Sequence, residues 1–158
     1  MALSFQPHDH DHCMSDALAT AEELCADKKL RLTPIRKLVY EILLTDHRAM
    51  GAYQILDELK KRGEKSQPPV AYRALDFLQQ HGFVHKIERL NAFIACTHPH
   101  DGHKPVFLIC RSCDQVAEAH AELSEGRLGR AADEAGFEIE KTVVEAVGLC
   151  PNCKDETD

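Results

Sequence analysis

The sequence lacks any apolar run close to the ~20 residues that a membrane-crossing helix needs. Its first residues, Met-Ala-Leu-Ser-Phe-Gln-Pro-His, lack both the basic start and the apolar core of a secretory signal. We therefore expect a cytoplasmic protein with no membrane partner. In that reducing compartment the 7 cysteines, an odd number, are better explained as metal ligands or reactive thiols than as disulfides.

The chain also lacks an overall positive charge, since its formal net charge is −7 at pH 7. The charge is unevenly divided: residues 28–89 hold 13 Lys and Arg against 7 Asp and Glu, whereas the remainder holds 6 against 19. A basic first half is typical of nucleic-acid binding, and the acidic second half, rich in His and Cys, indicates a separate function on the same chain. Two solvated surfaces that differ by chance would give the same counts, so charge alone decides nothing.

Helical periodicity dominates the first half of the 158 residues. We expect helices over residues 15–26, from Thr33-Pro34 onward, over 52–61 and over 70–81. Two β-prone runs follow, over 83–87 and 92–96, with a turn between them. Three or four helices and a hairpin make a winged helix, which is a helix-turn-helix variant that binds DNA.

The chain changes character after Cys96. Residues 97–105 form a His-rich loop, which we interpret as a hinge between two domains. Strands are expected over 106–110, 116–119 and 138–147, and a helix over 122–135. This second unit has few large apolar residues, so it needs a staple or a partner to be stable.

Two Cys-x-x-Cys pairs mark the ends of that unit: Cys110 with Cys113, and Cys150 with Cys153. A two-residue gap lets both thiolates point at one ion, and two such pairs complete a tetrahedral S4 zinc site. The 36 residues between the pairs exceed the usual spacing of a zinc ribbon. A folded unit must therefore bring the pairs together, which makes the predicted zinc structural. A redox pair or a thiol switch at the same residues is the alternative.

Several motifs in order give the chain a resemblance to a known family. It resembles the ferric-uptake-regulator superfamily, and within it the zinc uptake regulator branch, over about residues 15–153. The matching runs are Arg31-Leu32-Thr33-Pro34 with Arg36, Ala52-Tyr53-Gln54-Ile55-Leu56, Pro68-Pro69-Val70-Ala71-Tyr72-Arg73-Ala74-Leu75-Asp76-Phe77-Leu78, Gly82-Phe83-Val84-His85-Lys86-Ile87-Glu88 and Gly148-Leu149-Cys150.

The resemblance implies an α/β (α+β) protein of two domains. Residues 15–96 would be an N-terminal winged helix-turn-helix DNA-binding domain, and residues 106–153 a small C-terminal α/β dimerisation domain that binds zinc. Residues 97–105 would be the hinge, residues 1–14 a flexible His-rich tail and residues 154–158 a second tail. Relatives form homodimers that, when loaded with zinc, bind palindromic operators in double-stranded DNA and repress zinc-uptake genes.

The resemblance also implies a regulatory zinc site, made of His85, Cys96, His103 and Glu118, beside the structural site of the four cysteines. Two zinc ions per subunit are therefore expected. Two imidazoles, one thiolate and one carboxylate form a plausible tetrahedral zinc set. Spacing alone does not single out these residues among ten histidines. Because the ligands come from both domains, metal binding would favour one arrangement of the domains.

Contacts to DNA are implied on the helical side. In relatives the residues at Tyr53 and Arg73 reach DNA, and an arginine there can read guanine in the major groove. Tyr72, Arg31 and Arg36 are further candidates, and the arginines can pair with phosphates. A solvated basic face is the alternative for any one of these positive charges.

Two departures from the family pattern stand out. Relatives carry Thr-Val where this chain has Val70-Ala71, so a hydroxyl that caps the helix or meets a phosphate is absent. The chain is also unusually rich in histidine. A third metal site at His98, His100 and His120 is weighed against a solvated loop, and the tract of His8, His10, His12 and Cys13 against a tail that binds metal weakly.

Alternative functions remain. A sibling that senses iron, manganese or peroxide would be expected to have a site richer in His and carboxylate, whereas Cys96 favours zinc. A zinc hydrolase would need an open coordination position and a general base, so we expect neither an enzyme nor a small-molecule substrate. A thiol redox switch or a metal-storage protein would have no use for a helix-turn-helix.

Overall fold

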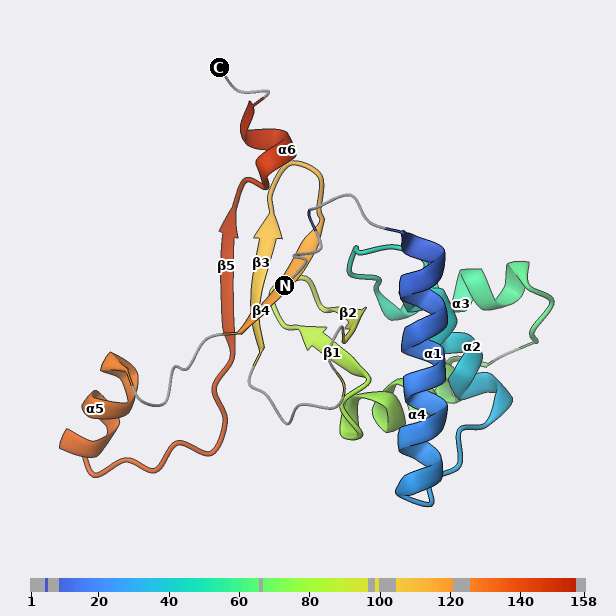
Figure 1. Cartoon of the computed structure of the whole chain (residues 1–158), viewed down its shortest axis with the longest axis horizontal. Helices are drawn as coiled ribbons and strands as arrows, with labels where there is room; N and C mark the ends of the chain where they lie inside the picture. Colours follow the sequence, from blue (N-terminus) through green and yellow to red (C-terminus); the bar gives the residue numbers. More distant parts are fainter. Residues whose placement is uncertain are drawn as a thin grey trace.

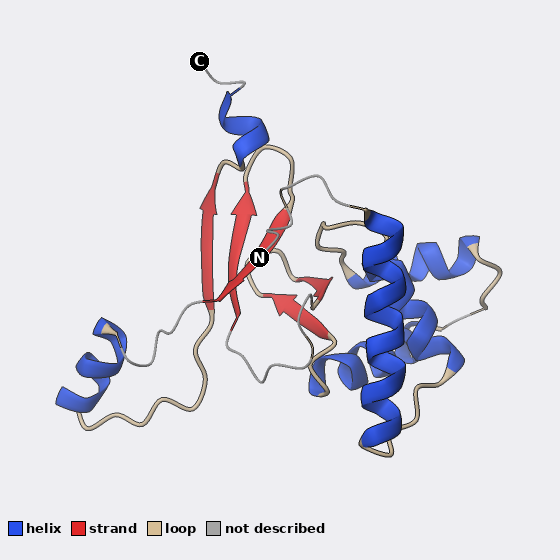
Figure 2. Ribbon diagram, in the orientation of Figure 1, coloured by secondary structure: helices blue, strands red, loops and turns tan. Residues whose placement is uncertain are grey.

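The computed structural model describes residues 5, 9–65, 67–96, 99, 105–120 and 126–155, except for the side chain of His120. The four helices of residues 10–80 gather on one side of the molecule and a three-stranded sheet lies on the other, with a short hairpin between them (Figures 1 and 2). The elements in chain order are α1 (His10–Asp27), α2 (Pro34–Leu44), α3 (Ala52–Lys61), α4 (Pro68–Gln80), β1 (Val84–Ile87), β2 (Ala92–Ala95), β3 (Pro105–Cys110), β4 (Val116–His120), α5 (Arg127–Glu134), β5 (Val144–Gly148) and α6 (Pro151–Lys154).

The helix ends follow from local chemistry. Thr33 is the N-cap of α2, and its hydroxyl accepts a hydrogen bond from the Arg36 N–H, as the Thr33-Pro34 pair predicts. Gly82 follows the C-cap of α4 with a φ of 79°, a left-handed conformation that glycine adopts without strain. The first helix differs from prediction, because Asp9 caps it and it begins at His10 rather than at Ser15.

The four helices and the hairpin share one apolar core. The helix-turn-helix pair α3 and α4 packs on α2, and α4 also contacts β1. Fully buried side chains in this core include Tyr40, Leu59, Leu75 and Phe83. With the antiparallel hairpin β1–β2 beside it, this half of the chain is the predicted winged helix.

The second half is built on a mixed sheet of order β4-β3-β5. β3 pairs antiparallel with β4 and parallel with β5, in a register that sets Cys110 opposite Gly148. A strand is predicted over 138–147, but β5 begins only at Val144 and is therefore shorter than expected. Helix α5 lies apart from the sheet at the end of long connections (Figure 1).

The two halves meet through the hairpin and the loop that follows α2. Ile87 and Ile94 of the hairpin pack with Phe107, Ile109 and Val116 of the sheet in a second apolar cluster. The Glu145 carboxylate on β5 accepts hydrogen bonds from the backbone N–H groups of Glu88 (2.6 Å) and Arg89 (3.1 Å), at the hairpin turn. The junction is thus both apolar and hydrogen-bonded.

Among the described residues, no helix combines the length and the apolar character needed to cross a membrane.

Candidate metal centres and nucleic-acid interface

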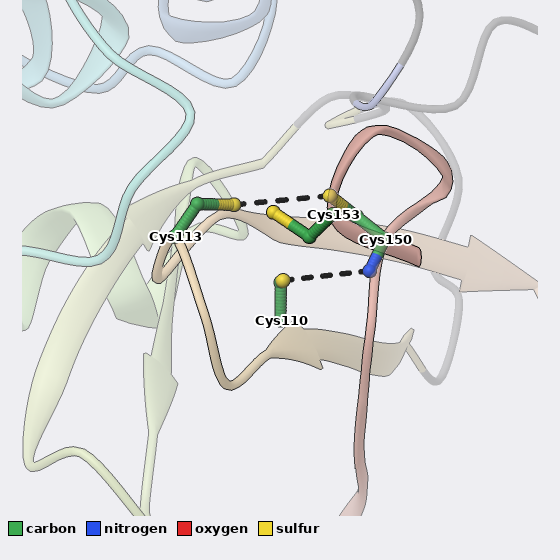
Figure 3. A group of neighbouring side chains, drawn as sticks. All are labelled: Cys110, Cys113, Cys150 and Cys153. Carbon is green, nitrogen blue, oxygen red and sulfur yellow. Dashed lines mark hydrogen bonds between the residues drawn. The ribbon is translucent and has the colours of Figure 1, made fainter. Parts of the chain in front are cut away.

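The four cysteines of the two Cys-x-x-Cys pairs converge, as predicted. The parallel pairing of β3 with β5 brings the turn after β3 against the start of α6, and the side chains of Cys110, Cys113, Cys150 and Cys153 gather between them (Figure 3). Their sulfur atoms all lie within 4.8 Å of one another. Cys110 and Cys150 are buried, at 1% and 2% exposure, which shields the group from solvent.

The cysteine geometry fits tetrahedral zinc. Thiolates about 2.3 Å from a central zinc ion lie about 3.8 Å from each other. The Cys113 and Cys150 sulfurs are 3.8 Å apart. The Cys150 N–H donates to the Cys110 Sγ at 3.4 Å, a hydrogen bond that orients this sulfur before any metal is bound (Figure 3). The four residues can therefore hold a zinc ion with little rearrangement.

The electrostatics of the cysteine group are uneven. Burial raises the pKa of Cys110, but hydrogen bonds from the backbone N–H groups of Cys150, Cys113 and Ser112 outweigh burial and lower its pKa to about 6. The pKa of Cys153 is raised to about 12, first through its contact with Cys150. Without metal the group therefore favours a thiolate at Cys110, and zinc must displace the proton of Cys153.

A second group lies at the junction of the two halves. His85 on β1, Cys96 at the end of β2 and Glu118 on β4 present ligand atoms within 4.8 Å of one another. The His85 Nε2 is 3.4 Å from the Glu118 Oε1, and the Cys96 Sγ is 3.8 Å from the same oxygen. Glu118 is the one buried charged side chain among the described residues, at 8% exposure, and burial of a carboxylate is costly unless it is paired, hydrogen-bonded or neutralised.

The structure thus brings together three of the four predicted regulatory ligands. His103, the fourth, lies outside the described residues, as do His98, His100 and the side chain of His120. The distances among His85, Cys96 and Glu118 suit a single ion with bonds of about 2.0–2.3 Å. Nitrogen, sulfur and oxygen donors in one small group are a typical zinc set.

The predicted DNA contacts lie on the outer surface of the helices. Tyr53 at the start of α3 is 78% exposed, and Tyr72 on α4 is 44% exposed, with Arg73 beside it also exposed. Arg31 is exposed before α2, whereas Arg36 is only half-buried and makes internal contacts. Its guanidinium donates to the Arg31 carbonyl at 2.6 Å and stacks 3.8 Å over the Phe77 ring.

A third group was not predicted as a unit. His10, Cys13 and His47 also present ligand atoms within 4.8 Å of one another. The tract that holds His10 and Cys13 stands out in the sequence, but no spacing rule connects it to His47. Such contacts depend on how α1 crosses the end of α2, which only the fold determines.

A winged helix with metal-ligand side chains at its hairpin defines a class of metal-dependent DNA-binding proteins. The chain belongs to the ferric uptake regulator family, whose family model matches residues 27–147.

Similar proteins support a closer placement within that family. The zinc uptake regulation protein of Escherichia coli (strain K12) is 40% identical over 140 residues, which cover 87% of this chain and 81% of that protein. A solved zinc uptake regulator complexed with zinc and DNA is 38% identical and superposes with a TM-score of 0.85, over 90% of this chain and 96% of that one.

The chain can also be compared with two solved forms of one similar protein. The holo form of XcZur, 37% identical, gives a TM-score of 0.79 over 87% of this chain and 96% of that one. The apo form, 36% identical, gives 0.53 over 90% of this chain and 99% of that one. At nearly equal identities, this chain therefore superposes more closely on the holo form than on the apo form.

Proposed function

We propose that the protein is a zinc-responsive repressor that binds operator DNA as a homodimer and controls zinc-uptake genes. The observation that carries this function is the group of His85, Cys96 and Glu118, because it joins the hairpin of the winged helix to β4 of the second sheet. The similarity to the zinc uptake regulator complexed with zinc and DNA supports both the metal and the partner. Two zinc ions per subunit are proposed, one in this group and one in the cysteine group.

Regulation follows from the position of the ligands. His85 and Cys96 belong to the hairpin of the helical half, whereas Glu118 belongs to the sheet of the second half. A divalent cation bound by all three lowers the free energy of the arrangement in which they converge, and so increases its population. We propose that His103 completes the set. The arrangement in which these ligands converge, which superposes better on holo XcZur than on apo XcZur, is then the one that binds DNA.

The domain roles follow the same division. We propose residues 15–96 as the DNA-binding domain, 97–105 as the hinge and 106–153 as the dimerisation domain. In the first of these, Arg73 reads base edges, while Tyr53, Tyr72 and Arg31 contact the DNA around it. Arg36 supports this surface mainly from behind, because it links α2 to Phe77 on α4.

A dimer suits the exposed apolar side chains of the second half. Leu128, Phe137, Val143 and Val147 are 44–66% exposed, and β5 is an edge strand of its sheet. Apolar side chains and an unpaired strand edge are an aggregation risk unless another surface covers them. We propose a second copy of the chain as that surface, which gives a two-fold dimer matched to a palindromic operator.

The alternatives are less well supported. An iron, manganese or peroxide sensor would be expected to use His and carboxylate donors, whereas the buried thiol of Cys96 is a softer ligand that suits zinc. A hydrolase would need a solvent-accessible metal position, and the groups described here are largely buried. A simple thiol switch would not need the exposed face of α3 and α4.

The test is a zinc titration of DNA binding. Full-length protein, stripped of its regulatory metal, would be titrated with buffered free Zn²⁺ while binding to its own uptake-gene promoter is followed by gel shift. We expect operator binding to appear with zinc, to be lost in Cys96→Ala, and to persist in Cys25→Ala. Cys25 is a matched control because it is buried in the helical core, at 3% exposure, away from the metal groups.

Competing metals decide between the family branches. Iron(II) and manganese(II) are expected to restore binding far less well than zinc. Binding that ignores zinc, or that iron restores equally, would contradict the zinc-sensor function and leave the family membership intact.

A further inference from the structure

We infer a third metal site, formed by His10, Cys13 and His47, that binds Zn²⁺ or a similar borderline divalent cation. His10 and Cys13 are three residues apart on α1 and therefore share a face of that helix. His47 lies in the loop between α2 and α3. One ligand atom from each lies within 4.8 Å of the other two, and all three residues are partly buried.

The histidine rings are already oriented for binding. The His10 Nε2 lies 2.8 Å from the Thr45 carbonyl oxygen, and the His10 and His47 ring centroids are 4.9 Å apart at 70°. A metal-binding histidine commonly donates one ring N–H to a carbonyl and coordinates through its other nitrogen. The Thr45 carbonyl would fix the His10 ring in this way, leaving coordination to Nδ1.

Two imidazoles and a thiolate are a zinc-type donor set, with a fourth position for water or a further ligand. Burial, followed by the Asp16 carboxylate, raises the pKa of the Cys13 thiol. Cys13 is therefore not an activated thiolate, which argues against a redox role. A metal ion that binds here takes the place of the thiol proton, which is released to solvent.

The site lies where it can influence the junction of the two halves. The His47 carbonyl accepts a hydrogen bond from the Val116 N–H at 3.1 Å, and Arg48 forms a β-bridge with Gln115. Val116 begins β4, the strand that carries Glu118. A metal that ties α1 to the His47 loop would therefore stiffen the loop on which β4 docks.

The test is a count of bound metal on the full-length chain. Wild type and variants would be dialysed against a series of buffered free Zn²⁺ concentrations. The zinc content per protomer would then be measured by inductively coupled plasma mass spectrometry. Cys13→Ser and His47→Ala are each expected to bind one zinc fewer than wild type. His12→Ala is the matched control, because that exposed histidine pairs with Asp16 at 3.2 Å and is not part of the group.

Two further measurements distinguish zinc bound at the third site from zinc bound at the regulatory group. The Cys13→Ser and Cys96→Ala changes should each remove one zinc and together remove two, so failure of the regulatory site does not hide the third site. Cobalt(II) titration should show weaker thiolate-to-metal charge transfer in Cys13→Ser. An unchanged zinc count in both Cys13→Ser and His47→Ala would overturn the site, as would an equal loss in His12→Ala.

Discussion

Val70 stands at the start of α4 with 36% of its surface exposed, whereas the next residue, Ala71, is fully buried. The N-cap residue of this helix, Gln67, makes no side-chain hydrogen bond to the first turn. The helix therefore presents an exposed methyl surface and no hydroxyl at the place where the family pattern has threonine. At this position a single side chain can alter DNA affinity without altering the core.

Val70→Thr is therefore expected to tighten zinc-dependent operator binding several-fold, because one added hydrogen bond to a phosphate contributes about 1 kcal/mol. The free energy of unfolding should change by less than about 0.5 kcal/mol, as is usual for a surface change. Fluorescence anisotropy with labelled operator measures the first effect and urea denaturation the second. Ala71→Val serves as a contrast, since the added methyl groups would crowd the core. Unchanged affinity in Val70→Thr would show that position 70 does not face a phosphate.

At the scale of single elements, β5 performs two tasks with one strand. Its pairing with β3 positions the segment that carries Cys150 and Cys153 beside the other two cysteines. Its Glu145 carboxylate accepts a hydrogen bond from the backbone of the hairpin turn. That carboxylate accepts from backbone groups, so any sequence at residues 88–89 other than proline could donate the same hydrogen bonds. The residue types at positions 88 and 89 therefore do not predict the contact with Glu145.

Glu145→Gln should weaken zinc-dependent DNA binding by a few-fold, because a neutral amide accepts these hydrogen bonds less strongly than a carboxylate, by about 1 kcal/mol. The zinc content of the cysteine group should stay unchanged. Measuring operator affinity and zinc content in the same preparation separates a loss of DNA binding from a loss of zinc. Glu138→Gln is a control at an exposed position outside the strand. Equal effects of the two changes would argue that only overall charge matters.

The cysteine group holds the second sheet, which has few large buried side chains of its own. At a free zinc concentration of 1,000 times the Kd, a bound ion adds about 4 kcal/mol to the free energy of unfolding. Cys153→Ser should therefore lower the Tm by roughly 8–16 °C in a zinc-containing buffer. A strong chelator should bring the wild-type Tm down towards that of the variant. A Tm for Cys153→Ser equal to that of wild type would mean that the sheet is stable without this zinc.

Most of the elements could be predicted from local patterns. The Thr33-Pro34 start, the glycine stop at Gly82 and the Cys-x-x-Cys pairs each have a local physical cause, and the structure has them where expected. The start of α1 could not be placed as well, because a run of alternating His and Asp gives no apolar periodicity. Contacts such as His47 with Cys13 join residues far apart in sequence, so only tertiary packing creates them.

At the scale of the whole molecule, the two halves differ in how completely they are buried. The helical half encloses its core, whereas the second half leaves Phe137 66% exposed beyond α5 and Val147 44% exposed on its edge strand. Helix α5 extends away from the sheet (Figure 1). The proposed second subunit would cover this exposed apolar surface.

Phe137→Asp is expected to shift the protein from dimer to monomer at micromolar concentration, because a charge in an apolar interface costs several kcal/mol. Light scattering after size-exclusion chromatography measures the mass directly. Leu90→Asp is the matched control, as Leu90 is 40% exposed in the hairpin turn of the other half. If Phe137→Asp keeps the dimer mass while remaining folded, the dimer surface must lie elsewhere.

The parallel pairing of β3 with β5 also orders the events of synthesis. Cys110 and Cys113 are synthesised first, and 36 residues separate them from Cys150 and Cys153. During translation the winged helix can fold while half of the metal ligands do not yet exist. The nascent chain can therefore form the complete cysteine group, and with it a metal-stabilised second half, only after α6 has emerged from the ribosome.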